Sequence, residues 1–377
     1  MDARTGDAYE DMAVRRLIIS DLHFGSPDAL LAAPAALDRI EPELQWADEL
    51  VINGDLLELV FASLEEAVAA ARPFLALANR HVGRVHFLPG NHDHHLVSLA
   101  GDERRFADVL GTPPPTLFEL TPAERLLRAL CPDAETVCAY PVCELDGMHI
   151  THGHYVAPHV GSSDWRLMDR LAWRLTGEPS RPDRLTVADY EALAAPLYEL
   201  MYEIANLPSG KRAQQQLERW LVVMSAVARA PQRASRRLGG LAQALARRVG
   251  RGALAPADAP AAGVLQAMQA VCRNLDIAPG TVLFGHTHLP LDGVPTPDGA
   301  YRLYNSGSWV WDRRLREAAD YRECAWPGTV LRATGGDVEL RGLLADCDED
   351  GLRELAGAPA GPRPRRRLRP QLVPVRR

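Results

Sequence analysis

The sequence is poor in cysteine and contains no long apolar run. Its 377 residues include six cysteines, and no two of them form a C-x-x-C pair. Sparse cysteines argue against a disulfide framework and against a zinc knuckle. No stretch approaches the ~18–20 apolar residues that cross a bilayer, and the polar residues 1–7 lack the apolar centre of a signal peptide. We therefore expect a cytoplasmic protein with reduced thiols.

Lysine is almost absent, because Lys211 is the only one and arginine carries nearly all the positive charge. The formal net charge is −7, yet two segments are strongly basic. Residues 211–252 hold ten basic residues and one acid, and residues 353–377 hold eight arginines and one acid. Such segments either contact an anionic surface or ligand or are simply solvated, and composition leaves both interpretations open.

Five short apolar runs are each followed at once by polar residues that can bind metal ions. The runs are residues 17–19, 50–52, 85–89, 148–151 and 281–284. Their length and their flanking Gly and Asp residues predict buried strands. A helical pattern over residues 64–80, with Ser63 as its N-cap, follows the second run. This repetition predicts an α/β core with parallel pairing, in which ligands collect beyond the carboxyl ends of the strands.

The chain changes character between its fourth and fifth predicted strands. We divide it into a first core segment, a helical insertion, a second core segment and a Pro/Arg-rich tail, at residues 14–156, 157–275, 276–345 and 346–377. Within the insertion, Thr186 and Asp189 form a T-x-x-D capping box for a helix. The second core segment has a hairpin turn at Asp298-Gly299. The composition of the tail predicts disorder.

The polar residues at the strand ends combine carboxylate, imidazole and amide groups. They are Asp21, His23, Asp55, Asn91, His92, Asp93, His152, His286 and His288. Asp21 and His23 are two residues apart, so on an extended segment both side chains would point to one side and reach one cation. Asp55 has two carboxylate oxygens and can bridge two cations. Mixed imidazole and carboxylate ligation suits Mn, Fe, Zn or Ni better than Ca or Mg.

A pair of cations ~3.5–4 Å apart acidifies a bridging water and neutralises charge in an in-line displacement at phosphorus. His92 follows the candidate ligand Asn91 and would lie over the leaving-group oxygen, as a general acid or hydrogen-bond donor. We expect Asp93 to orient His92, a common role for a carboxylate beside a histidine.

Other polar residues near these motifs have less defined roles. His154 could contact the ligand shell from outside, face the substrate, or only hydrogen-bond within its loop. Glu58 is expected to anchor a loop or to support a ligand, and not to bind a cation itself. His94 and His95 are expected on a solvated helix start.

These motifs resemble those of the calcineurin-like metallophosphoesterase superfamily, whose pattern D-x-H, G-D, G-N-H-D, H and G-H-x-H is present in order and in full. The resemblance implies an α+β fold of four layers, α/β/β/α, in which helices flank two mixed sheets; the large helical insertion lies outside it. It also implies a catalytic His92, one cation held by Asp21, His23, Asp55 and His288, and a second held by Asp55, Asn91, His152 and His286.

The resemblance further implies a metal-dependent phosphoric ester hydrolase with two divalent ions, Mn being favoured over Fe, Zn and Ni. A metal-bridging hydroxide would attack a phosphodiester, pyrophosphate or phosphomonoester bond. Residues 54–58 and the insertion look like those of UDP-2,3-diacylglucosamine hydrolases, which split a pyrophosphate in a lipid-linked sugar nucleotide. Those enzymes often carry arginine where this chain has His92, so the natural substrate stays open.

The expected partner is a small phosphorylated substrate, nucleotide- or lipid-linked. The insertion could be a lid that selects this substrate, a basic face on anionic lipid at the inner side of the membrane, or a packing element, and we favour the lid. One alternative function is a DNA-end nuclease of the same superfamily. This function, and a nucleic-acid partner, are disfavoured because such nucleases carry a DNA-capping domain after G-H-x-H and little chain follows His288 here. A second is a non-catalytic membrane- or partner-binding scaffold, which should lack ligands, and none is missing here.

Overall fold

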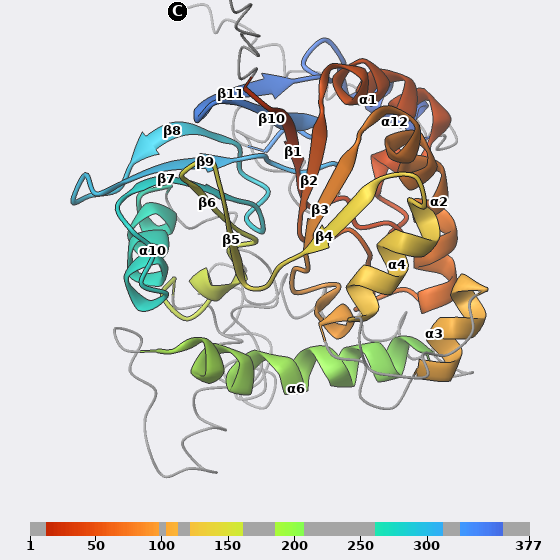
Figure 1. The fold of residues 1–377 in the computed structure, drawn as a ribbon, viewed down its shortest axis with the longest axis horizontal. Helices are drawn as coiled ribbons and strands as arrows, with labels where there is room; N and C mark the ends of the chain where they lie inside the picture. Colours follow the sequence, from red (N-terminus) through yellow and green to blue (C-terminus); the bar gives the residue numbers. More distant parts are fainter. Residues whose placement is uncertain are drawn as a thin grey trace, which may run out of the picture.

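The computed structural model describes residues 13–97, 103–111, 121–160, 185–206, 261–311 and 325–356. Within these ranges two β-sheets face each other, and helices lie on the outer side of each sheet (Figure 1). This arrangement confirms the four-layer α/β/β/α architecture of the α+β class.

The larger sheet has six strands in the order β11-β10-β1-β2-β3-β4. Their bounds are β1 (Arg15–Ile19), β2 (Glu49–Asn53), β3 (Arg84–Leu88), β4 (Glu135–Cys138), β10 (Thr329–Thr334) and β11 (Asp337–Gly342). Strands β1 to β4 pair in parallel, with Leu17 opposite Leu50 and Leu50 opposite Val85. Strand β10 pairs antiparallel with β1 and β11. The first three predicted strands are therefore confirmed as parallel neighbours.

The smaller sheet has five strands in the order β5-β6-β7-β9-β8. Their bounds are β5 (Val142–Leu145), β6 (Met148–Thr151), β7 (Gly280–Phe284), β8 (Leu291–Pro295) and β9 (Tyr301–Asn305). The central strands β6, β7 and β9 are parallel, and the edge strands β5 and β8 are antiparallel to their neighbours. The turn predicted at Asp298-Gly299 joins β8 to β9. The five predicted strands are thus divided between two sheets.

Helices cover the outer sides of both sheets (Figure 1). On the six-stranded side they are α1 (Pro34–Trp46), α2 (Leu64–His81), α3 (Glu103–Leu110), α4 (Pro122–Leu130) and α12 (Glu349–Leu355), and on the other side α10 (Ala261–Asn274). Helix α2 begins after the predicted N-cap, since Ser63 Oγ accepts from the Glu66 N–H. Helix α12, with Leu352 buried, is ordered although it belongs to the segment predicted to be disordered. Residues 357–377 of that tail lie outside the described residues.

Both faces of the strands are buried, which explains why they read as continuous apolar runs. Along β1, Leu17 and Ile19 pack toward the helices, and Ile18 packs between the two sheets. Ile18 meets Val51 of the same sheet and Ile150 of the facing sheet in this inner layer. The buried layer between the sheets brings the ends of their strands together.

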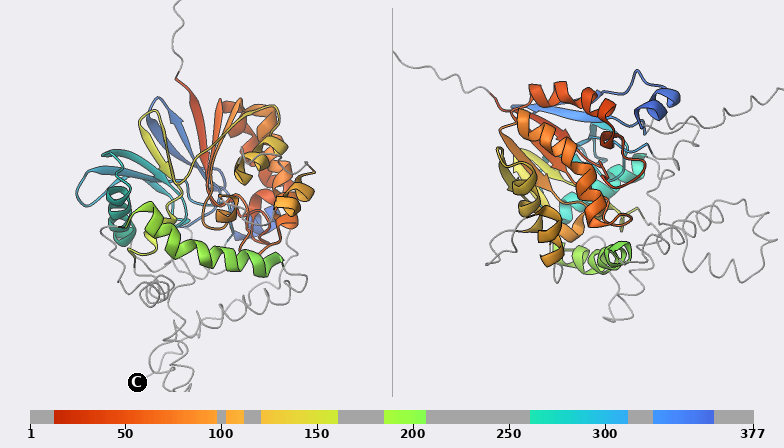
Figure 2. Two further views of the ribbon diagram at one scale, coloured as in Figure 1. Left: turned by 60° about the horizontal axis from the view of Figure 1, so that its bottom comes forward. Right: turned by 90° about the vertical axis from the view of Figure 1, so that its right-hand side faces the viewer.

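One helix of the insertion lies within the described residues near that end. Helix α6 (Val187–Asn206) starts at the predicted capping box, in which the Thr186 Oγ accepts from the Asp189 N–H. It runs across one end of both sheets, from the side of α10 to the side of α3 (Figures 1 and 2). The basic segment 211–252, with its proposed lid or membrane role, lies outside the described residues. No described helix is long and apolar enough to span a bilayer.

Candidate metal centre

The predicted ligands lie just beyond the carboxyl ends of strands from both sheets. Strands β1, β2 and β3 lead to Asp21 and His23, to Asp55 and to Asn91, and strands β6 and β7 lead to His152 and to His286 and His288. The six-stranded and five-stranded sheets therefore each supply part of one cluster, as expected at this edge of parallel strands.

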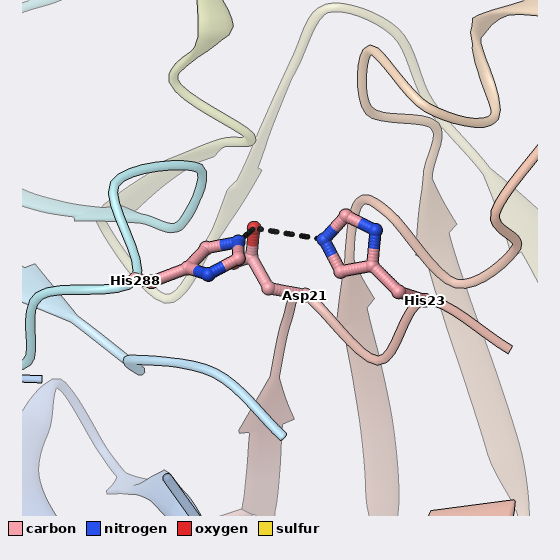
Figure 3. A group of neighbouring side chains, drawn as sticks. All are labelled: Asp21, His23 and His288. Atoms are coloured by element: carbon pink, nitrogen blue, oxygen red, sulfur yellow. Dashed lines mark ion pairs between the residues drawn. The ribbon is translucent and has the colours of Figure 1, made fainter. Parts of the chain in front are cut away.

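Asp21, His23 and His288 form the first group of side chains that could hold a cation. His288 Nε2 lies 3.2 Å from Asp21 Oδ1. His23 Nε2 lies 3.9 Å from the same oxygen, so Asp21 stands between the two imidazoles (Figure 3). His23 Nε2 also lies 3.6 Å from Oδ2 of Asp55, which brings the second carboxylate to this group.

The second group contains Asp55, His152 and His286. His152 Nε2 lies 3.2 Å from Asp55 Oδ2 and 3.2 Å from Asn91 Oδ1. His286 Nδ1 lies 2.8 Å from the same Asn91 oxygen. Asp55 therefore borders both groups, the position that a bridging ligand would require.

The backbone at these positions adopts a conformation that L-residues rarely take. The φ angles are 55° at Asp21, 48° at His23, 53° at Asp55, 63° at His286 and 58° at His288. The prediction that Asp21 and His23 align through strand alternation is therefore wrong in its reason, because both residues follow β1 in left-handed turns. Non-glycine residues in this region cost free energy and concentrate at functional sites.

Two glycines allow the close approach of these loops. A Cβ atom on Gly54 would lie 2.1 Å from His152 Nδ1, and one on Gly90 would lie 2.3 Å from Asp55 Oδ1. Neither position can accept a side chain without moving a candidate ligand. The glycine before Asp55 is thus required by contact with a loop of the other sheet, and the glycine before Asn91 by contact with the neighbouring loop of its own sheet.

The donor atoms fit divalent cations. His23 Nδ1–H donates to Glu58 Oε2 at 2.9 Å, and its Nε2 is buried without a hydrogen-bond partner. His152 Nδ1–H donates to the Asn53 carbonyl at 2.9 Å, which leaves its Nε2 facing Asp55. A histidine held at one nitrogen presents the other as a ligand.

The electrostatics of the centre also call for positive charge. Burial favours the neutral acid, but His152 and His92 outweigh it and hold the pKa of Asp55 well below its usual range. Burial lowers the pKa of His152, and Asp55 overcomes this and raises it to about 10. Cations bound at this centre would lie beside the Asp55 carboxylate and supply positive charge to it.

The structure changes the predicted surroundings of His92. His92 Nδ1–H donates to Glu58 Oε1 at 2.7 Å, so Glu58 and not Asp93 orients the ring. The Asp93 carboxylate accepts from the backbone N–H groups of Gly90 and Leu56, at 2.5 and 2.7 Å. Asp93 therefore holds the loops of the candidate ligands, and the sequence prediction of its role was wrong.

Glu58 is a residue whose role the sequence understated. It is 5% exposed and accepts hydrogen bonds from both His23 and His92. Its position three residues after Asp55 was visible, but nothing along the chain indicated which histidines it would meet. His94 and His95 are also buried, at 8% exposure each, and not on a solvated helix start. His154 is buried, and its Nε2 lies 3.3 Å from the hydroxyl of Tyr140.

Part of the chain is similar to a known protein family. Residues 14–191 match the model of the calcineurin-like phosphoesterase family. The sequence matches no curated protein. The crystal structure of phosphopantetheinyl hydrolase (PptH) from Mycobacterium tuberculosis is similar at 15% identity, over 82% of this chain and 94% of that chain, with a TM-score of 0.29. A mutant cold-active protein tyrosine phosphatase is similar at 14% identity, over 87% and 80%, also with a TM-score of 0.29. Such TM-scores do not establish a shared activity.

Proposed function

We propose that this chain, whose residues 14–191 belong to the calcineurin-like phosphoesterase family, hydrolyses its substrate with two divalent cations. Metal-dependent phosphoester hydrolysis follows from the family, and the number of cations and the residues that hold them are our proposal. The observation that carries it is the position of Asp55. Its Oδ2 lies 3.2 Å from His152 Nε2 and 3.6 Å from His23 Nε2, so one carboxylate borders both ligand groups.

Each cation would be held by residues from both sheets. The ligands would be Asp21, His23, Asp55 and His288 for the first cation, and Asp55, Asn91, His152 and His286 for the second. We favour Mn, with Fe, Zn and Ni as alternatives, because the ligands mix imidazoles and carboxylates. Bound there, the cations would polarise the phosphoryl group and lower the pKa of a water molecule.

His92 is the proposed general acid. Its Nδ1–H is held by Glu58, so Nε2 would be the nitrogen that donates to the substrate. The side chain is 22% exposed, whereas Glu58 behind it is almost fully buried. Substrate can therefore reach the imidazole while its orientation is maintained from inside. Proton donation to the leaving-group oxygen is worth about 10²–10⁴ in rate.

The substrate is proposed to be a small phosphorylated molecule, nucleotide- or lipid-linked, cleaved at a phosphodiester, pyrophosphate or phosphomonoester bond. Helix α6 runs across one end of both sheets (Figure 2). Its Glu191 contacts His94, three residues after Asn91, which supports the lid role for the insertion. Assays on mono- and diesters, nucleotide diphosphate sugars and DNA, each with Mn, Ni, Zn or Mg, would separate these classes. Activity on DNA ends alone would favour the nuclease alternative.

The test of the two-cation centre is the Asp55→Asn variant. Because Asp55 borders both groups, we expect the variant to lose affinity for both cations and to lose activity with them. Elemental analysis of protein dialysed against Mn would measure the stoichiometry. Two bound metals per chain in the variant would contradict the bridging assignment, and fewer than two in the wild-type protein would contradict the centre itself.

A further inference from the structure

A single carboxylate on α6 joins three separate segments beside the metal centre. Glu191 Oε1 accepts hydrogen bonds from the hydroxyls of Tyr140, at 2.5 Å, and of Tyr155. Glu191 Oε2 lies 2.5 Å from His94 Nε2, which donates to it. Tyr140 lies between β4 and β5, Tyr155 is in η3 (His154–Val156), and His94 begins η2 (His94–Leu96). Glu191 thus holds parts of the chain that are far apart in sequence.

Two of these segments directly follow candidate ligands of the second cation. Helix η2 begins three residues after Asn91, and η3 begins two residues after His152. Asn91 follows a strand of the six-stranded sheet and His152 a strand of the five-stranded sheet. Glu191 therefore links the two loops whose ligand atoms, Asn91 Oδ1 and His152 Nε2, lie 3.2 Å apart.

Other contacts fix α6 on either side of this link. Tyr202 stacks on His95, with ring centroids 3.6 Å apart and an interplanar angle of 16°. Tyr190 stacks on Tyr155, with ring centroids 4.3 Å apart and an angle of 7°. Both partners belong to the same short helices, η2 and η3. The helix therefore presents Glu191 from a backbone that is packed against both loops.

The first group of ligands is not part of this network. Among the described residues, the Glu191 carboxylate accepts hydrogen bonds from Tyr140, Tyr155 and His94. None of these three segments carries Asp21, His23 or His288. A substitution at Glu191 should therefore change the affinity of one cation site more than that of the other.

We propose that Glu191 is a positioning residue for the second cation, whose ligands would be Asp55, Asn91, His152 and His286. By fixing the distance between the Asn91 and His152 loops, it would raise the affinity of this site and leave the first site unchanged. Cation sites tolerate only a few tenths of an ångström in ligand position, so support from outside the ligand set determines affinity. The inference rests on the two-cation function proposed above.

The test measures Mn binding to chelator-treated protein by calorimetry, with electron paramagnetic resonance to detect coupling between two Mn ions. Glu191→Ala should weaken one of two binding steps by roughly tenfold, the lower end of the effect of such supporting residues. The other step should stay unchanged. Glu199→Ala is the matched control, because Glu199 is an exposed carboxylate on the same helix, and it should bind both ions as the wild type does.

Two further backgrounds identify which site responds. In a His288→Ala background, which leaves the second site, adding Glu191→Ala should weaken the remaining Mn by roughly tenfold. In a His152→Ala background, which leaves the first site, adding it should have no effect. Equal weakening in both backgrounds, or none in either, would overturn the inference.

Folding and function are controlled separately. If circular dichroism shows that Glu191→Ala does not fold, Tyr155→Phe removes one hydroxyl donor to Glu191 and keeps the ring. This variant should weaken the same step in the same direction, and unchanged binding would count against the inference. Wild-type protein that binds fewer than two Mn ions would instead refute the proposed two-cation function.

Discussion

Glu58 connects the proposed general acid to a proposed ligand. Its two oxygens accept from His92 at 2.7 Å and from His23 at 2.9 Å. Burial would raise the pKa of Glu58, but the two histidines outweigh it and lower this pKa to about 2. The group is therefore a carboxylate at neutral pH, and it can hold both rings at the same time.

We predict that Glu58→Gln, assayed at saturating Mn, lowers kcat by roughly 10–100-fold, the usual effect of losing an outer support of a ligand. In the amide an NH2 donor replaces one of the two carboxylate oxygens, so one of the two rings loses its acceptor. His92→Asn should lower kcat by roughly 10²–10⁴-fold. For both variants the loss of kcat should be smaller with substrates that have good leaving groups. Rates on p-nitrophenyl and alkyl esters would measure this.

Asp93→Asn is the contrasting variant. Asp93 holds the backbone of Gly90 and Leu56, so its loss should lower stability and leave the leaving-group dependence as in the wild type. The assignment of Glu58 as the partner of His92 would be contradicted if the rate loss of Glu58→Gln were the same for good and poor leaving groups. It would also be contradicted if the rate loss of Asp93→Asn depended on the leaving group.

At the scale of the elements, the strands of the larger sheet carry charge at both ends. Opposite the metal centre, buried Glu49 at the start of β2 accepts from Arg16 Nε at 2.7 Å and from Arg84 at 2.8 Å. His86 Nε2 on β3 lies 3.1 Å from Glu49. Burial raises the pKa of Glu49, but Arg16 outweighs it and the net pKa is lowered. Burial also lowers the pKa of His86.

This network predicts acid sensitivity. Both pKa values are lower in the folded chain, so the unfolded chain binds more protons and the free energy of unfolding falls as pH falls. For His86 the loss begins below its unfolded pKa of about 6.5, and each unit of depression is worth about 1.4 kcal/mol. Between pH 7 and 5.5 the free energy of unfolding of His86→Gln should therefore fall less than that of the wild type. Urea unfolding would measure both proteins at the same metal concentration. Equal pH slopes in variant and wild type would exclude this contribution.

At the scale of the whole molecule, the centre joins two sheets that each lack a complete site. Asp21, Asp55 and Asn91 come from the six-stranded sheet, and His152, His286 and His288 come from the five-stranded sheet. Between the sheets, Ile18 and Ile150 are fully buried in the layer that holds this alignment. Cations bound at the centre should therefore stabilise the packing of one sheet on the other.

We predict that metal removal lowers the thermal midpoint of the chain. Ligands that bind only the folded state stabilise it by about 2.7 kcal/mol at 100 times Kd. Calorimetric scans with Mn and with a chelator should differ for the wild type and coincide for Asp55→Asn. A chelator effect of the same size in both proteins would show that the stabilising metal binds elsewhere.

Much of the fold and most of the centre follow from the sequence. The strands, the caps at Ser63 and Thr186 and the clustering of polar residues at strand ends depend on neighbours in the chain, so spacing and residue type suffice to predict them. Parallel pairing explains why Asp21, His23 and Asp55 converge at one end of the larger sheet and why the later histidines converge at one end of the smaller sheet. The packing of one sheet on the other then brings the two sets together. The identity of the candidate ligands was therefore determined by sequence.

The tertiary structure decided the features that depend on which loops meet. Strands with the same apolar pattern belong to two different sheets. The pattern of a strand does not determine which strand pairs with it, so the division into two sheets could not be predicted. The carboxylate that holds His92 proved to be Glu58, 34 residues away, and not the adjacent Asp93, because the packing of the loops and not distance along the chain selects the partner. The left-handed turns at Asp21 and Asp55 cost conformational free energy, and contacts with distant segments of the chain offset it. The hydrogen bonds of Glu191 likewise join segments that are distant in sequence.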